Sequence, residues 1–296
     1  KIAKFEGNWH GGYDPLHVAV KPPLDQPESG GLAEGATEDT TVLPYNDLEG
    51  VRKRIKGLDL ACMLIEPVMG GGGIIPADKE FLKGLREICD DTGTLLVFDE
   101  VMTGFRVSPG GAQQLYGVLP DLTVLGKIVG GGFPIGAIAG RGEVMEHMDH
   151  FKYQGTEYCF LGGTHVGNPI STSAGYATLK FLEDGTIHSR IDKLGEKASR
   201  GMQDIFDRSN FEAQTSSIGS LFACHFTSKR PIKDIHTVSL GNVEVAKRFH
   251  RYLLDRGIFI LTPVLVHGAI SSAHTEEDID ELLATVEGFV RSEAKG

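Results

Sequence analysis

The sequence predicts an α/β protein, with a mostly parallel sheet in a large first domain and a smaller α+β second domain. Two apolar runs, 60–65 and 95–98, flank an amphipathic helical pattern over 78–91. Strands without polar alternation are typical of a parallel sheet that is covered on both faces. Further along, helical patterns alternate with shorter strands. We therefore expect domains 1–183 and 184–296.

The elements of the first domain are bounded by residues that begin or end regular structure. The helical pattern places Phe81, Leu85 and Ile88 on one face, and Gly93 ends it. In chain order we expect a loop over 18–47, strand 60–65, helix 78–91, strands 95–98, 122–125 and 135–139, and helix 171–183.

The boundary of the second domain is expected near 180–186, where the sequence changes to helical patterns that alternate with short strands. Its last helix is the clearest element, because Thr275 is a suitable N-cap and three acidic residues follow it in the first turn. The expected elements are helices 190–208, 243–256 and 276–292 and strands 220–226 and 258–261.

The composition argues against several classes of function. The 296 residues include 29 Lys and Arg against 40 Asp and Glu, a net charge of −11. Binding of nucleic acid or of an anionic membrane requires a basic face, so neither partner is expected. No apolar run approaches the roughly 18 residues that a membrane span needs. The four cysteines form no Cys-x-x-Cys pair, so we expect reduced thiols in a cytoplasmic protein.

Charged residues follow three of the expected strands. Glu66 and Asp99 come directly after an apolar run, and Lys127 follows one after a single glycine. Because ligands bind beyond the carboxyl ends of parallel strands, these three side chains could share one crevice. The glycine runs 70–73 and 130–132 have neither P-loop nor dinucleotide spacing, and the eleven histidines form no metal motif. A nucleotide or metal site is therefore not expected.

Two motifs and several shorter segments carry a family resemblance. The motifs are LVFDEVMTGFR at 96–106 and DLTVLGKIVGGG at 121–132. Together they resemble the signature of the class III aminotransferases, with the family's spacing between its Asp and its Lys. Supporting segments are FEGNWHG at 5–11, EPV at 66–68, GT at 163–164, GNP at 167–169 and SAHTEED at 272–278. Within the family, the pattern is most similar to glutamate-1-semialdehyde aminomutases and β-amino-acid transaminases.

The resemblance implies the fold of the fold type I transferases and the cofactor pyridoxal 5′-phosphate (PLP). Lys127 would bind the cofactor covalently and move the proton during catalysis. Asp99 would pair with the pyridine nitrogen. Trp9 and Val101 would contact the two faces of the ring, and Thr164 would contact the phosphate of the neighbouring subunit's cofactor.

Two further residues are assigned to the surroundings of the cofactor by the same resemblance. Glu66 and His10 would support the residues that touch it. Their presence completes the set of cofactor-binding residues that the sequence predicts. No metal ligand is included in it.

The chain departs from the family's pattern in two places. The family's phosphate-binding turn, which opens a helix upstream of the Trp9 segment, has no counterpart, so the family's N-terminal portion is expected to be absent. Val266 stands where the aminomutases carry a Glu, and the carboxylate-binding Arg of some transaminases has no counterpart in 261–267.

These observations predict a homodimeric transaminase with shared active sites, which moves an amino group between a small-molecule donor and acceptor. One alternative is an aminomutase that uses the same residues intramolecularly, against which Val266 counts. A second alternative is a non-catalytic remnant of the fold. The absent phosphate-binding turn favours it, and the presence of Lys127 and Asp99 counts against it.

Overall fold

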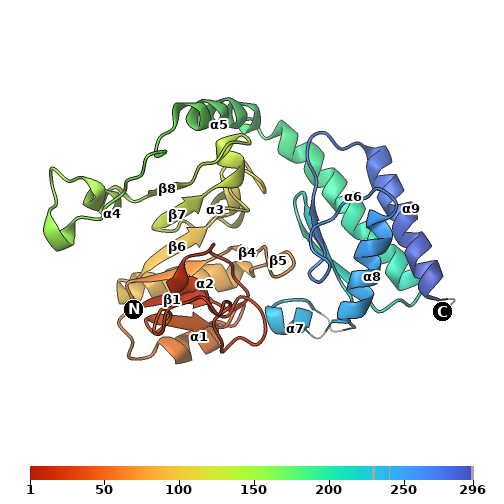
Figure 1. The fold of residues 1–296 in the computed structure, drawn as a ribbon, viewed down its shortest axis with the longest axis horizontal. Helices are drawn as coiled ribbons and strands as arrows, with labels where there is room; N and C mark the ends of the chain where they lie inside the picture. The colour runs from red at the N-terminus through yellow and green to blue at the C-terminus, as the bar shows by residue number, and fades with distance from the viewer. Residues whose placement is uncertain (229–230, 240, 295–296) are drawn as a thin grey trace.

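A computed structural model of the chain describes residues 1–228, 231–239 and 241–294. Figure 1 shows a larger sheet at one side and a smaller sheet with its helices at the other. α5 (Pro169–Leu182) leads from the first part into α6 (Thr186–Arg208), which lies beside the smaller sheet. None of the helices in these three described stretches combines the length and apolar character that crossing a membrane requires.

The larger sheet has six strands in the order β2-β1-β3-β6-β7-β8. All neighbouring strands are parallel except β7 and β8, which are antiparallel. The mostly parallel sheet predicted from the apolar runs is therefore confirmed. The strands are β1 (Ile2–Phe5), β2 (Thr40–Leu43), β3 (Cys62–Ile65), β6 (Leu95–Asp99), β7 (Leu122–Leu125) and β8 (Ala137–Gly140).

Helices and short turns connect these strands. α2 packs an apolar face that includes Phe81, Leu82 and Leu85, and it ends at Gly93, whose φ of 71° a side chain would resist. The other elements are α1 (Leu48–Ile55), α2 (Lys79–Thr92), α3 (Gly111–Tyr116), α4 (Gly142–Met145), α5 (Pro169–Leu182), the hairpin β4 (Val68–Met69) and β5 (Ile75–Pro76), and the 3-10 turns η1 (Asp14–Leu16), η2 (Lys127–Gly130), η3 (Glu146–Met148) and η4 (Gly155–Glu157).

The smaller sheet is antiparallel, in the order β11-β10-β9. Helices α6, α8 and α9 pack against it around a second apolar core, in which the rings of Phe249 and Phe289 meet edge to face at 5.1 Å. Its elements are α6 (Thr186–Arg208), β9 (Gln214–Ile218), β10 (Leu221–His225), α7 (Ile235–Ser239), α8 (Val243–Leu254), β11 (His267–Ala269) and α9 (Glu276–Glu293).

Two sequence-based expectations about the elements were wrong. The strand predicted over 258–261 is not formed; Leu261 makes only an isolated bridge to His267, and the third strand of the small sheet is β11. The loop predicted over 18–47 contains β2 at its end. Both errors have the same cause, because short strands are stabilised by the neighbour they pair with more than by their own residues.

Several contacts join the two parts. The Arg106 guanidinium donates to the Ile270 carbonyl at 3.0 Å, and the Ser216 hydroxyl donates to the Gly73 carbonyl at 3.2 Å. Residues of β10 and α7 also belong to the apolar core of the large sheet. Gly73 thus lies where the two parts of the chain meet.

Candidate functional site

The topology brings three of the predicted site residues to one edge of the large sheet. Glu66 follows β3, Asp99 ends β6, and Lys127 follows β7 by one glycine. These three strands are adjacent and parallel, so their carboxyl ends meet at the same edge. Lys127 is close enough to Glu66 for its charge to lower the pKa of that carboxyl, against the larger effect of burial.

Asp99 is buried and held by two donors. Its Oδ2 lies 2.7 Å from His10 Nδ1, and its Oδ1 accepts from the Val101 backbone N–H at 3.1 Å. A carboxylate can only accept, so Nδ1 of the histidine carries the proton of this hydrogen bond. The two donors fix the orientation of the Asp99 carboxylate at the end of its strand.

His10 comes from a different part of the sequence, the loop that follows β1. Burial lowers the pKa of His10, although the neighbouring Asp99 opposes this effect. The neutral imidazole donates through Nδ1, which leaves Nε2 as an acceptor. Within the described residues this buried Nε2 has no hydrogen-bond partner. His10 therefore contacts Asp99 through Nδ1 and helps to fix the orientation of its carboxylate.

Glu66 holds the loop that carries His10 and Trp9. Its Oε2 accepts from the Trp9 backbone N–H at 2.7 Å, and its Oε1 from the Gly70 N–H at 3.3 Å. The Glu66 backbone N–H donates to the Asn8 side chain at 2.8 Å. Burial raises the pKa of Glu66 to about 8, although the two N–H donors oppose the rise. Glu66 is thus a buried anchor for this loop.

Lys127 has an unusual backbone conformation, with φ at 50°. This left-handed conformation is unfavourable for a residue with a side chain and is typical of sites where the backbone is held for a purpose. Lys127 is exposed, and among the described residues its amine makes no hydrogen bond or ion pair. A Cβ at the preceding Gly126 would lie 3.2 Å from Val101 Cγ1, so Val101 packs tightly against Gly126.

The two remaining predicted residues differ in their placement. Trp9 is 43% exposed and its ring lies 5.1 Å from the His17 ring. Thr164 lies in an exposed turn before α5, on the segment that leaves the sheet after β8 (Figure 1). In the part of the chain that the structure describes, no hydrogen bond joins Thr164 to the other predicted site residues. Six of the seven predicted residues are therefore clustered, and Thr164 is separate.

Sequence reasoning missed two buried polar residues beneath the cluster. Asn8 is fully buried and binds the Glu66 backbone, and Lys4 is fully buried in β1. The Lys4 amine donates to the carbonyls of Asn8, Leu16 and Val18. The sequence does show a lysine just before the FEGNWHG segment. A sequence alone, however, does not distinguish a buried lysine from a surface lysine.

One cavity lies near this cluster, although none of the seven predicted site residues lines it. This cavity, of about 440 Å³, extends from Gly71, beside Trp9, to Val264 and Leu265 of the small domain. Val266 does not line it, because its side chain is fully buried in the second core. Val266 is thus part of the second core, and the neighbouring residues at 264 and 265 are the ones that line the cavity.

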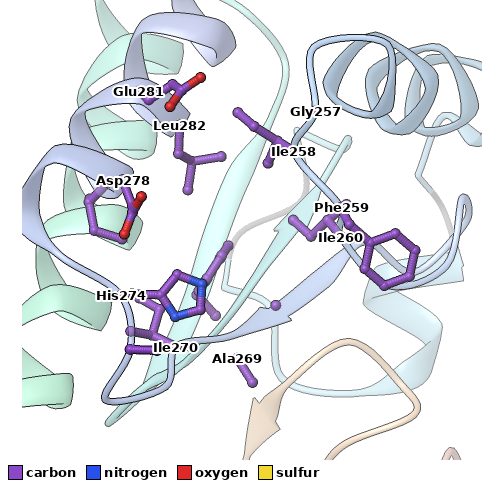
Figure 2. A pocket seen from close by; sticks show the side chains of 14 residues that line it. Gly257, Ile258, Phe259, Ile260, Ala269, Ile270, His274, Asp278, Glu281 and Leu282 are labelled. Carbon is purple, nitrogen blue, oxygen red and sulfur yellow. The ribbon is translucent and has the colours of Figure 1, made fainter.

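A second cavity, of about 660 Å³, lies within the small domain. Figure 2 shows His274, Asp278 and Leu282 on one side of it and Phe259 and Ile260 on the other. None of the seven predicted site residues lines it. The chemistry that the sequence predicts therefore belongs to the edge of the large sheet and not to this cavity.

Comparisons with known proteins give the relatives of this chain. It is 39% identical over 295 residues to the glutamate-1-semialdehyde 2,1-aminomutase of Aquifex aeolicus, a match that covers 98% of this chain and 68% of that protein. The solved structure of an omega-transaminase from Sphaerobacter thermophilus superposes with a TM-score of 0.91 at 34% identity, covering 100% of this chain and 69% of that one. A transaminase with PLP bound gives a TM-score of 0.86 at 34% identity, with the same coverage.

The chain thus spans about two thirds of the length of these relatives. The expected fold type I architecture is confirmed by the two transaminase structures. The family profile described as aminotransferase class III matches residues 1–287, which is nearly the whole chain. The resemblance carried by the two signature motifs is therefore confirmed, and the chain belongs to the class III aminotransferases, enzymes that transfer amino groups with the help of PLP.

Proposed function

We propose that this chain moves an amino group between an amine or amino acid and a keto acid or aldehyde, at the site around Asp99 and Lys127. The observation that carries the proposal is the buried Asp99–His10 pair at the end of β6, next to a strand end that presents the free amine of Lys127. A buried carboxylate and an unpaired lysine on adjacent strand ends are the two groups that PLP chemistry requires.

The residues present fit the cofactor. Asp99 keeps unused lone pairs beyond its bonds to His10 and Val101, so it can accept from a protonated ring nitrogen. Trp9 presents a half-exposed aromatic face, and Val101 packs against the Gly126 turn. Lys127, Asp99, Trp9 and Val101 would hold PLP. When bound, PLP supplies an electron sink for the charge that develops on the substrate carbon.

The roles of the side chains follow from their positions. Asp99 holds the proton on the ring nitrogen, and His10 holds Asp99 in orientation through Nδ1–H. The amine of Lys127, which has no hydrogen-bond or ion-pair partner among the described residues, would accept and return a proton at Nζ once the cofactor is bound. Trp9 and Val101 would shield the bound cofactor from water. Glu66 acts at one remove, by holding the Trp9 backbone.

We also propose that the active protein is a homodimer in the cytoplasm, with residues 1–183 as the PLP-binding domain and 184–296 as the small domain. The dimer is supported by exposed aromatic residues between η2 and α6, namely Phe133, Phe151, Phe160, Tyr176 and Phe181. Isolated proteins rarely expose so much apolar surface in one segment. Thr164 lies within this segment and would reach the partner's cofactor phosphate. The four free cysteines support a reducing compartment.

A second candidate is a 2,1-aminomutase, which the name of the Aquifex relative favours. One assay separates the candidates. Transamination requires both an amino donor and an added keto acid, whereas isomerisation of glutamate-1-semialdehyde proceeds without an added acceptor. We expect product only when donor and acceptor are both present, with Lys127→Ala as the inactive control. Turnover of glutamate-1-semialdehyde alone would establish the aminomutase, and no turnover in either assay would support the non-catalytic remnant.

A further inference from the structure

Lys4 occupies an unusual position for a lysine, in the middle of β1 with none of its side chain exposed. Burying an ammonium group is costly unless all of its donors find partners. The Lys4 amine has three N–H donors and contacts three carbonyl oxygens, those of Asn8 at 2.9 Å, Leu16 at 3.2 Å and Val18 at 2.5 Å. Each donor therefore has one acceptor.

These three carbonyls belong to one loop, which we call the Trp9 loop and define as residues 8–18. Asn8 begins it, and Leu16 and Val18 lie at its end. The Gly7 backbone N–H also donates to the Ala19 carbonyl at 2.8 Å, so the two ends of the loop are close together. A compact loop whose ends are joined in this way holds its shape through a few contacts at its neck. Lys4 fills that neck.

The start of the Trp9 loop, next to Asn8, carries the two site residues that come from this part of the sequence. Trp9 follows Asn8 directly, and His10 contacts Asp99 at 2.7 Å. Glu66 holds the loop from the other side, through the Trp9 N–H at 2.7 Å and the Asn8 side chain at 2.8 Å. The loop is thus fixed between Glu66 at the end of β3 and Lys4 within β1.

We infer that Lys4 is a positioning residue for the cofactor site: it closes the Trp9 loop and thereby sets the positions of Trp9 and His10. The inference rests on the proposed function for its consequence, which is PLP binding. Burial lowers the pKa of Lys4 to about 8, and the charges of Glu66 and Glu28 oppose this effect. The charge on the amine is thus retained at neutral pH, where all three carbonyls are satisfied.

The chain offers a direct reporter of this loop, because Trp9 is its single tryptophan. The experiment compares the full chain with its Lys4→Met variant, in which the side chain keeps its bulk and loses its three donors. Acrylamide quenching of Trp9 fluorescence reports on the loop before PLP is added. A titration with PLP then gives the dissociation constant. Leu85→Ala is the matched control, since it removes buried apolar surface from α2 in the same core.

We expect Lys4→Met to raise the quenching constant of Trp9 by about twofold or more, since the loop loses its closure. The PLP dissociation constant should rise by about 10- to 100-fold, the range expected when a positioning contact is lost. Leu85→Ala should lose stability without either change. Unchanged quenching in Lys4→Met, or equal changes in both variants, would overturn the inference.

Two provisions keep the result decisive. If Lys4→Met does not fold, Lys4→Gln replaces it, because the shorter amide keeps some donors and should give an intermediate effect on the same two measurements. If the unmodified chain binds no PLP, the proposed function fails, whereas the quenching comparison still shows whether Lys4 closes the loop. A Gln variant identical to the unmodified chain in both measurements would refute the role.

Discussion

Replacing Asp99 by Asn tests the centre of the proposed site with little change in side-chain volume. The carboxylate accepts from His10 Nδ1 at 2.7 Å and from the Val101 N–H at 3.1 Å. An amide has one acceptor oxygen, so its NH₂ group must face one of these two donors. If it faces His10, the imidazole must accept through Nδ1 and carry its proton on Nε2, which is buried and has no partner among the described residues.

The magnitudes for stability and for rate differ. The charge-assisted hydrogen bond from His10 is worth about 1.5–3 kcal/mol, and its loss is partly offset because a buried charge is removed. Asp99→Asn should therefore fold, with a modest loss of stability. For the rate, a neutral amide cannot hold a proton on the cofactor's ring nitrogen. Removing one preorganised charge partner of this kind costs about 100- to 1000-fold in kcat.

The assay measures keto acid formation from the amino donor at saturating PLP, together with unfolding in urea. Asp121→Asn is the control, since Asp121 is a buried carboxylate in the same sheet region that binds Arg86 at 2.8 Å, Arg141 at 2.7 Å and the Leu96 N–H at 2.7 Å. It should lose stability and keep its kcat. An Asp99→Asn variant with kcat within about tenfold of the unmodified chain would refute the role assigned to Asp99.

Three further predictions concern the neighbouring residues. Borohydride reduction after PLP loading should attach the cofactor to the peptide that contains Lys127, which mass spectrometry detects. The label should be absent in Lys127→Ala, and a label on another lysine would contradict the assignment. Gly126→Val should raise the PLP dissociation constant by about tenfold, because its Cβ would lie 3.2 Å from Val101 Cγ1 and overpacking costs about 1–3 kcal/mol; an unchanged value in a fluorescence titration would argue against the tight contact. The pKa of Glu66 is about 8 in the folded chain, above its ordinary value of 4.5. Between these two pH values the folded chain keeps the Glu66 proton and the unfolded chain releases it. Its contribution to stability is therefore full below that ordinary value and is lost as the pH rises toward 8. In urea unfolding at several pH values, Glu66→Gln should flatten this decline, and an unaltered slope would count against it.

The strands that carry the chemistry were predictable because they are apolar throughout. β3, β6 and β7 begin with runs that no charged residue interrupts, so burial leaves a clear pattern in the sequence. β1 and β2 were not predicted, because Lys4 interrupts the apolar run of β1 and two threonines open β2, the edge strand. Lys4 and Thr40 have polar side chains, and only the structure shows the carbonyls to which they donate.

The residues of the candidate site also differ in how far the sequence predicts them. Asp99 and Lys127 were predictable because each follows a central strand within a family motif. The pairing of His10 with Asp99 was not, because 89 residues separate them and only the strand order places them together. The anchoring of Trp9 by Glu66 was missed for the same reason, since the contact spans 57 residues. Sequence patterns indicate which residues belong to a site but not which of them touch.

The strand order also explains why Glu66 must be buried. The large sheet runs β1-β3-β6, so β3 separates the strand that precedes His10 from the strand that carries Asp99. The Trp9 loop can bring His10 to Asp99 only by crossing the end of β3, where Glu66 lies. A backbone that crosses a strand end needs acceptors for its N–H groups, and Glu66 supplies one to Trp9 at 2.7 Å. Its carboxyl is covered by the loop that it supports, and that burial is the cause of its raised pKa. Glu66 therefore serves the site by making the crossing possible, while the proposed contacts with the cofactor are left to Asp99, Trp9 and Lys127.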